Sequence, residues 1–386
     1  MAETAETAET AENERATERP MAGEQARSGM VDVAANGIAA SLSEGIVIAI
    51  APGFFEVASG DEAFLCTLRG RLRVSRPQAP APGSARRPVD AGAGRRLHRG
   101  PQRERPVTAV APAENPPVRI APGDRVRFLR LRAGEGVIEE VLPRRTALSR
   151  MRSEVGTEQI LLANPDHAVL AFAVRDPAPH FGMLDRYLAL CEHAGVDISI
   201  GLNKVDLGMP EEVRRAADLY ARLGYTVLAT SAETGAGVEG LRARLRDRTS
   251  LLTGPSGVGK SSLMNVLVPG AAQRIAAISE ATGKGRHTTT GVRLLPLPEG
   301  GWLADSAGIR ELALWNVPSE ALPRAFRELR PYADQCDYED CEHGEGEEGC
   351  ALRAALAAGA ITPERWASFA RLLDEARAQE APEWRR

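Results

Sequence analysis

The stretch Gly254-Pro255-Ser256-Gly257-Val258-Gly259-Lys260-Ser261 has the glycine, lysine and serine spacing of a phosphate-binding loop. It follows a short apolar run at 250–253 and precedes a helix-like run at 262–267, so a predicted strand leads into it and a predicted helix leaves it. The glycines allow backbone N–H groups to converge on phosphates at a helix N-terminus, where the helix dipole favours anions. We expect Lys260 to reach the outer phosphates, the Ser261 hydroxyl to bind Mg²⁺, and the loop through Ser262 to contact a nucleotide.

Two further motifs, both upstream of this loop, indicate recognition of guanine. In Asn203-Lys204-Val205-Asp206 the Asp206 carboxylate can accept hydrogen bonds from the N1–H and 2-amino groups of guanine, donors that adenine lacks. Asn203 can bond the opposite edge of the base, and the aliphatic stem of Lys204 can cover the ring. The motif Ser-Ala-x-x-Gly begins 25 residues later at Ser231, and the N–H of Ala232 is predicted to meet the guanine O6. The predicted nucleotide is therefore GTP.

The order of these motifs differs from that of an ordinary GTPase, in which the phosphate loop comes first. Here the guanine motifs precede it, so we predict a circularly permuted G domain over residues 151–325. Short apolar runs in this region alternate with helical stretches, a pattern typical of a parallel, doubly wound α/β sheet. The predicted strands are 168–174, 198–202, 226–230 and 250–253, and the predicted helices lie near 183–194, 210–223 and 236–246.

Two motifs downstream of the loop resemble the switch regions of GTPases. Asp305-Ser306-Ala307-Gly308 fits Asp-x-x-Gly, with Asp305 near Mg²⁺ and the Gly308 amide at the γ-phosphate. Gly285-Arg286-His287-Thr288-Thr289-Thr290 lies between it and the phosphate loop, where the first switch belongs. One of its threonines, for which we take Thr289, is expected to complete the Mg²⁺ shell with Ser261 and Asp305.

The position of the water-orienting glutamine of Ras-like enzymes is occupied by Ile309. An isoleucine cannot polarise water, so intrinsic hydrolysis should be slow and should depend on a partner. His287 is the best substitute, and together with Lys260, Asp305 and Gly308 it makes up the predicted catalytic set. Two roles for His287 stay open, because its geometry decides between them: it acts chemically, or it only positions the loop.

A cluster of soft ligands follows the G domain. Cys336-x4-Cys341-x-His343-x6-Cys350 offers one nitrogen and three sulfur atoms, the composition of a closed tetrahedral zinc site. Such closed coordination predicts a structural metal, and unmetallated buried thiols are the alternative. We assign residues 326–386 to a zinc-binding module that continues into two helical stretches rich in Ala, Leu and Arg.

The N-terminal part is predicted to be a small β domain over residues 44–150. Five apolar runs separated by Gly and Pro turns suggest a barrel of the oligonucleotide-binding (OB) type, and any other small β domain is the alternative. Residues 76–118, rich in Pro, Ala, Gly and Arg, read as an insertion that either contacts RNA or is a tolerated expansion. Residues 1–43, with three Ala-Glu-Thr triplets, are predicted to be a disordered tail. The five runs are 45–50, 55–58, 64–72, 125–131 and 136–142.

The bulk composition limits the possible classes of protein. A length of 386 residues allows two or three domains, and a formal charge of −4 does not by itself indicate nucleic-acid binding. The charge is uneven, since residues 76–105 hold eight Arg against two acids, a plausible phosphate-backbone contact. No apolar run approaches the ~20 residues of a membrane span. Five cysteines, with Cys66 and Cys191 expected in the core, favour the reducing cytoplasm, and we expect a monomer.

These motifs together resemble those of the ribosome small subunit-dependent GTPase A family, known as RsgA, YjeQ or EngC. The resemblance covers about residues 44–378 and extends to Ala163-Asn164-Pro165-Asp166, Leu184-Asp185-Arg186-Tyr187 and the stretch Arg310 to Trp315. It implies a late assembly factor that binds the small ribosomal subunit and its rRNA through barrel and zinc module, and that leaves on GTP hydrolysis. Without the water-orienting glutamine, GTP hydrolysis needs an activator, and the resemblance implies that the ribosome is that activator.

Some features depart from the family pattern or admit another function. The family's Asp-Thr-Pro-Gly is Asp305-Ser306-Ala307-Gly308 here, and neither the 76–118 insertion nor the N-terminal tail has a recognised counterpart. The alternatives are a permuted GTPase of another assembly step, and an rRNA-binding nucleotide sensor with little turnover. Because the second switch lies close to Cys336 in the sequence, we also hypothesise that the γ-phosphate sets the angle between zinc module and barrel.

Overall fold

The computed structural model describes six segments of the chain, residues 42–74, 119–132, 134–152, 157–271, 292–305 and 317–380. Residues 1–41 of the predicted tail, the predicted insertion, and His287, Thr289 and Gly308 of the predicted switches lie outside these segments, whereas Ser43, the last residue of the predicted tail, begins the first strand. None of the helices within them combines the length and the apolar character that a bilayer crossing requires.

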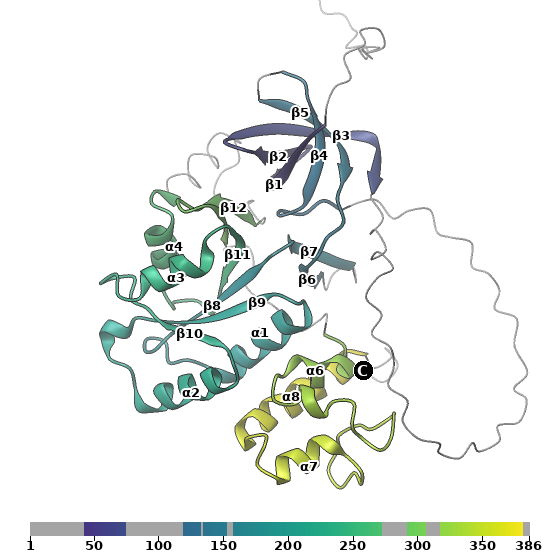
Figure 1. The fold of residues 1–386 in the computed structure, drawn as a ribbon, viewed down its shortest axis with the longest axis vertical. Coiled ribbons are helices and arrows are strands. Elements are labelled where there is room, and N and C mark those ends of the chain that lie inside the picture. Colours follow the sequence, from purple (N-terminus) through teal and green to yellow (C-terminus); the bar gives the residue numbers. More distant parts are fainter. Residues whose placement is uncertain are drawn as a thin grey trace, which may run out of the picture. The chain divides into compact units, whose positions relative to one another are not determined.

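The first five strands form a closed barrel (Figure 1). Around the barrel the order is β1-β2-β3-β5-β4, with β3 and β5 parallel and β1 paired to β4. This is the strand order of an OB fold, so the predicted OB-type barrel is confirmed. Its interior is a separate apolar core that includes Val57, Phe64, Phe128 and Ile138. The strands are β1 (Ser43–Ala51), β2 (Phe54–Ser59), β3 (Glu62–Val74), β4 (Arg125–Arg130) and β5 (Glu135–Val141).

A hairpin that the sequence did not predict connects the barrel to the next domain. Strands β6 (Ala147–Arg152) and β7 (Thr157–Ala163) pair antiparallel in a two-stranded sheet of their own. The predicted boundary between residues 150 and 151 falls inside β6. Leu148 and Leu162 of this hairpin are fully buried in the same core as the following sheet.

The six-stranded sheet has the order β10-β9-β8-β11-β13-β12. All neighbours run parallel except β12, which is antiparallel to β13. The strand that leads into the phosphate loop, β11, is central although three strands of the same sheet, β8, β9 and β10, precede it in the chain. The spatial order is thus that of a G domain, whereas the chain order is permuted, as predicted. The strands are β8 (His167–Ala173), β9 (Asp197–Asn203), β10 (Thr226–Ala229), β11 (Arg248–Thr253), β12 (Arg293–Pro296) and β13 (Gly301–Asp305).

Helices cover both faces of this sheet (Figure 1). Because side chains alternate along a strand, Leu170 and Phe172 of β8 face one core and Val169 and Ala171 face the other. Every residue of β8 is buried, as expected for a central strand of a parallel sheet. The first core is covered by α1 (Phe181–His193) and α2 (Glu211–Arg222), and the second by α3 (Val238–Leu245) and α4 (Lys260–Leu267).

The C-terminal helices extend the first of these cores. Phe326, Phe369 and Leu372 belong to the same buried cluster as Leu184 and Leu188 of α1. Helices α6 and α8 both contact α1, so the C-terminal module packs against the α1 face of the G domain. The elements are η3 (Ser319–Ala321), α6 (Leu322–Ala325), η4 (Arg330–Tyr332), α7 (Ala351–Ala357) and α8 (Pro363–Glu380).

Candidate nucleotide-binding site and metal centre

The candidate phosphate loop connects β11 to α4. At Gly254 (φ +151°) a Cβ would lie 2.0 Å from the carbonyl oxygen of Ala171, and at Gly259 (φ +91°) it would lie 2.4 Å from Nδ2 of Asn203. Glycine is therefore required at both positions, because the loop passes close to the ends of the neighbouring strands. Gly259 caps α4 without a side-chain hydrogen bond, which leaves the first N–H groups of the helix available to an anion.

The lysine of the loop turns back over it. Lys260 Nζ donates to the carbonyl oxygens of Gly254 (2.8 Å) and Pro255 (2.6 Å). Ser261 and Ser262, the next two residues of α4, are exposed. The ammonium group and the two hydroxyls thus lie at the loop and the adjoining helix end, as a phosphate and Mg²⁺ site requires.

A single buried amide joins the three nucleotide motifs. Asn203, 1% exposed, donates from Nδ2 to the Val258 carbonyl of the phosphate loop (2.9 Å). Its Oδ1 accepts from the N–H of Ala232 (3.2 Å) and from the Thr230 hydroxyl (3.4 Å). The sequence suggested a bond from Asn203 to the base. Here both polar atoms of the amide hold protein groups, so Asn203 fastens the phosphate loop to the guanine loops.

The candidate base-recognition residues are fixed in a similar way. The Ser231 hydroxyl donates to Asp206 Oδ1 (2.5 Å) and accepts from the N–H of Thr234 (3.1 Å). Ser231 is fully buried, whereas Asp206 is exposed in the short helix η1 (Val205–Leu207). The hydroxyl therefore orients a carboxylate that faces solvent, which suits recognition of an incoming base.

A neighbouring loop adds residues that sequence reasoning missed. Lys204 has a left-handed backbone (φ +63°), and its Nζ donates to the carbonyl oxygen of Asp176. A Cβ at Gly257 would lie 3.4 Å from Pro177, so the same loop also borders the phosphate loop. The Asp-Pro dipeptide directly after a buried strand was the available signal, since such pairs mark turns at strand ends.

The second switch begins at the same edge of the sheet. Backbone pairing sets Asp305, the last residue of β13, beside Leu252 of β11, one residue before the end of that strand. Within the described segments, the two guanine motifs, the phosphate loop and Asp305 thus lie at the carboxyl ends of parallel strands, the edge where open α/β sheets bind ligands. The side chain of Asp305 lies outside the description.

The predicted zinc ligands come together in the C-terminal module. One ligand atom from each of Cys336, Cys341, His343 and Cys350 lies within 4.8 Å of the others. His343 Nδ1 is 3.7, 3.3 and 3.5 Å from the three sulfurs in that order. Zn–S bonds of ~2.3 Å and Zn–N bonds of ~2.0 Å at tetrahedral angles separate N and S by about 3.5 Å, so the cluster fits a zinc ion.

The chemistry of the cluster agrees with its geometry. Burial and the neighbouring sulfurs raise the pKa of the Cys341 thiol to about 12, so a cation is needed to hold it as a thiolate. The loop around the cluster is braced by Glu347, whose carboxylate accepts from the N–H groups of Glu342 (2.8 Å) and Gly344 (2.7 Å). Ligation by all four side chains leaves no open position, which is typical of a structural zinc site.

Comparisons with known proteins agree with this arrangement. The family model described as RsgA GTPase matches residues 141–315. A protein of Gemmatimonas aurantiaca named small ribosomal subunit biogenesis GTPase RsgA is 44% identical over 264 residues, which cover 67% of this chain and 85% of that protein. The protein of the same name from Azotobacter vinelandii is 44% identical over 259 residues, covering 66% and 74%.

Two solved structures share the fold. The crystal structure of YjeQ from Thermotoga maritima superposes with a TM-score of 0.63 at 27% identity, covering 87% of this chain and 99% of that one. The structure of YloQ, described as a circularly permuted GTPase, gives a TM-score of 0.62 at 22% identity, covering 91% and 100%.

Fold and site together define a circularly permuted GTPase with an N-terminal five-stranded barrel and a C-terminal Cys₃His cluster. Identity of 44% to a relative covered over 85% of its length narrows this class to one family. The chain belongs to the RsgA GTPase family.

Proposed function

We propose that this chain hydrolyses GTP, with Mg²⁺, during late maturation of the small ribosomal subunit in the cytoplasm, as a monomer. The observation that carries the proposal is the Asn203 amide, which fastens the candidate guanine loops to the candidate phosphate loop. The names of the relatives support the link to the small ribosomal subunit.

In this proposal each motif residue has a defined task. Asp206, oriented by Ser231, recognises the guanine N1–H and 2-amino groups. Lys260 exchanges its bonds to the loop carbonyls for phosphate oxygens, and the hydroxyl of Ser261 ligates Mg²⁺. The N–H groups at the start of α4 hold the phosphates. Asp305 and Thr289 complete the Mg²⁺ shell.

Turnover is proposed to depend on the ribosome. Ile309 supplies no group that could orient water, so His287 or a group from the ribosome takes that role, with Gly308 at the γ-phosphate. Hydrolysis then weakens the grip on the subunit and releases the protein.

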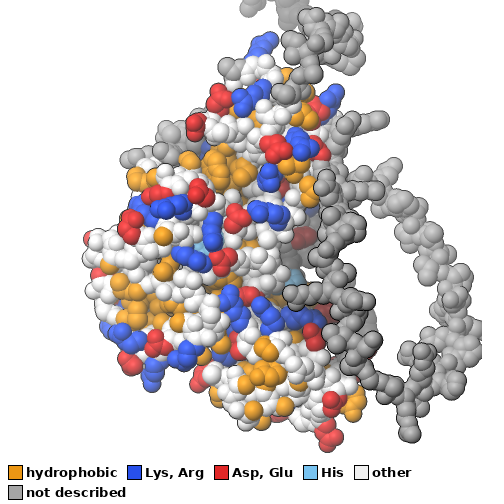
Figure 2. Space-filling model, viewed as in Figure 1, with side chains coloured by type: hydrophobic (Ala, Val, Ile, Leu, Met, Phe, Trp, Pro, Cys, Tyr) orange, Lys and Arg blue, Asp and Glu red, His pale blue; other side chains and the backbone are white. Residues whose placement is uncertain are grey.

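Barrel and zinc module are proposed to hold rRNA. Residues 337–348 around the zinc ligands hold seven acids and neither Lys nor Arg, so this loop would be repelled by phosphates. The phosphate contacts of the module are therefore assigned to its helices, where Arg371 is an exposed residue. Figure 2 shows Lys and Arg interspersed with Asp and Glu over the visible face, which favours several separate contacts over one basic field.

The decisive experiment measures GTP turnover of the full chain alone, with purified small subunits and with purified large subunits. Lys260→Ala serves as the blank, because it removes the phosphate-loop ammonium. We expect strong stimulation by small subunits only.

Other outcomes would contradict the proposal. Stimulation by large subunits only would assign the chain to another assembly step. Binding to small subunits without turnover would make it an rRNA-binding nucleotide sensor.

A further inference from the structure

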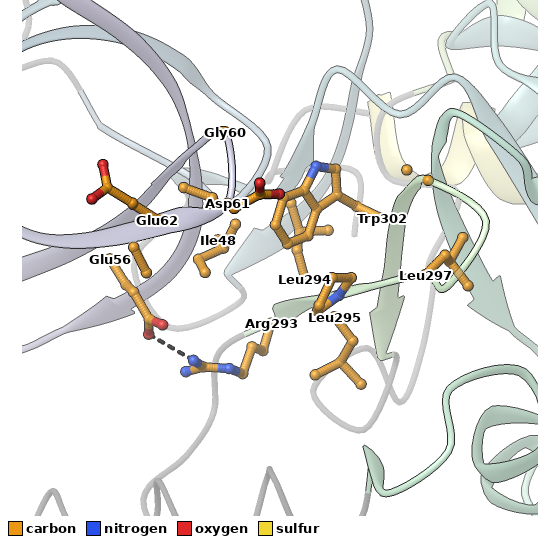
Figure 3. Close-up of a pocket in the computed structure, with 15 residues that line it drawn as sticks. Ile48, Glu56, Gly60, Asp61, Glu62, Arg293, Leu294, Leu295, Leu297 and Trp302 are labelled. Carbon is orange, nitrogen blue, oxygen red and sulfur yellow. Dashed lines mark hydrogen bonds and ion pairs between the residues drawn. The ribbon is translucent and has the colours of Figure 1, made fainter.

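A groove lies between the barrel and the hairpin of β12 and β13, beside the place where β1 contacts β12 (Figure 3). It encloses about 630 Å³ and is lined by β1, β2 and the β2–β3 turn on one side and by residues 293–302 on the other. A second hollow of about 300 Å³ borders the same Trp302 and shares Ala58 and Gly60 with the first. Because the two hollows share lining residues, one ligand can contact both.

One end of the groove is anionic and aromatic. Glu56 is neutralised by Arg293 (2.6 Å) and Glu62 by Arg130 (2.8 Å). Asp61 is exposed and has no ion-pair partner within the described segments. Asp61 and Trp302 both line this groove, one from the barrel and one from β13 (Figure 3). A carboxylate next to an aromatic ring is a site for a guanidinium or ammonium group, which gains an ion pair and a cation–π contact.

The floor of the groove is apolar. Ile48, Ala58 and Leu294 line it, and their side chains belong to one buried cluster, so this floor is firmly packed. Such a floor accepts the aliphatic stem of Arg or Lys, or a neighbouring apolar side chain. A nucleic acid would bring its phosphates toward Asp61, whose carboxylate has no ion-pair partner within the described segments, so a cationic ligand suits the groove better.

We propose that this groove binds an extended, basic protein segment, with an Arg or Lys against Asp61 and Trp302 and an apolar residue over Ile48 and Leu294. The inference rests on the proposed function, since the segment then belongs to a basic protein of the small ribosomal subunit. Strand β12 begins directly after the predicted first switch and β13 ends at Asp305, so the bound segment contacts both strands that lead to the switches.

The test uses the full chain bound to purified small subunits with a slowly hydrolysed GTP analogue. The photo-crosslinking residue p-benzoylphenylalanine replaces Ala63, an exposed residue of the groove, and in a control it replaces the exposed Asp218 of α2. We expect position 63 to crosslink to a basic segment of a ribosomal protein, and position 218 not to. Asp61→Lys should remove the crosslink and weaken subunit binding about tenfold. Glu135→Lys, the same charge change at an exposed barrel residue outside the groove, should do neither.

The outcomes separate the two proposals. If the unmodified chain does not sediment with small subunits, the proposed function fails, and the groove assignment fails with it. If the chain sediments but position 63 crosslinks only to rRNA, or to nothing, the groove assignment alone is overturned. An equal loss of binding in Asp61→Lys and Glu135→Lys would also overturn it, because charge in general would then explain the effect.

Discussion

The C-terminal module and the barrel are attached to the G domain in different ways. The module shares an apolar core with α1, and its buried Arg365 contacts two carboxylates, Asp185 of α1 and Glu328. The barrel has a core of its own and meets the G domain where Ile48 and Ala58 join the buried cluster of Leu294, beside an open groove in which the ion pair between Glu56 and Arg293 is partly exposed. Two parts of a protein that are joined by buried, paired charges move together as one body. Two parts that meet beside a solvent-lined groove can change their relative position at a small cost in free energy.

A second cluster strengthens the attachment of the module. Glu192 of α1 binds both Arg327 and Arg330 at 2.6 Å, and the Arg327 guanidinium stacks over Tyr225 at 3.9 Å. The module is thus held to the G domain by residues of α1, α8 and η4 and of two loops, one with Arg327 and one with Tyr225. We infer that any change of angle triggered by the nucleotide occurs where the barrel meets the G domain.

Removal of the proposed zinc is expected to have the largest effect. Zinc-binding free energy is folding free energy for small zinc modules, on the order of 10 kcal/mol. The zinc ligand Cys350, which precedes α7, is buried in the shared core. Loss of the zinc ion should therefore loosen α1 as well as the loop that carries the other zinc ligands. Hydrogen exchange before and after chelation should show reduced protection in both.

Two controls decide this prediction. Readdition of zinc should restore the protection, and the Cys341→Ser variant should resemble the chelated protein. Loss of protection confined to residues 336–350 would show that the module is attached more loosely than the shared core indicates.

The second-largest loss of stability is expected on replacement of the buried Arg365. Arg365→Leu leaves the carboxylates of Asp185 and Glu328 buried without their cationic partner. Asp185 then depends on the hydrogen bond that it accepts from Tyr220 (2.7 Å). Breaking a buried ion pair in this way costs about 3–5 kcal/mol of the free energy of unfolding. Urea unfolding of the variant measures it.

The matched control is Arg214→Leu, which breaks an exposed pair with Glu211 on α2. It should change the free energy of unfolding by less than about 0.5 kcal/mol. A similar small loss for Arg365→Leu would mean that the module is no more firmly attached than a surface residue.

The sequence predicted the parts that depend on local pattern and missed those that depend on contacts across the chain. The phosphate loop and the buried strand β8 were predicted because motif and periodicity act within a few residues. The pair of Asp185 and Arg365 joins residues 180 positions apart, and although Asp185 lies in a stretch that resembles the family, no local pattern indicates that its partner is Arg365. The hairpin of β6 and β7 was missed because polar residues interrupt its apolar run.

A histidine in the G domain core is expected to make a smaller, pH-dependent contribution to the free energy of unfolding. His167 is fully buried, its Nε2 lies 2.9 Å from the Ser199 hydroxyl, and Asp197, Arg244 and Arg248 are its charged neighbours. Burial lowers the pKa of His167 to about 4 from the ordinary value of 6.5. The unfolded chain therefore binds the extra proton between these values, and stability falls as the pH drops from 6.5 to 4, by about 3 kcal/mol.

The measurement is the free energy of unfolding from pH 7 to pH 4. His167→Gln, which keeps a hydrogen-bonding group without the titration, should lose this component of the slope. If the C-terminal module unfolds with the G domain, probes on α1 and on α8 should follow the same pH curve. Different pH curves for the two probes would contradict the inference that the C-terminal module and the G domain form one body.

The smallest effect is expected at the barrel contact, and it completes the comparison. Glu56 and Arg293 keep side-chain exposures of 29% and 19%, so water screens their attraction. A double-mutant cycle with Glu56→Gln and Arg293→Gln should give a coupling energy of about 0.5–1 kcal/mol. The same cycle with Asp185→Asn and Arg365→Gln should give a several-fold larger value, because both partners are buried. Equal coupling at the two contacts would remove the physical reason to locate movement at the barrel.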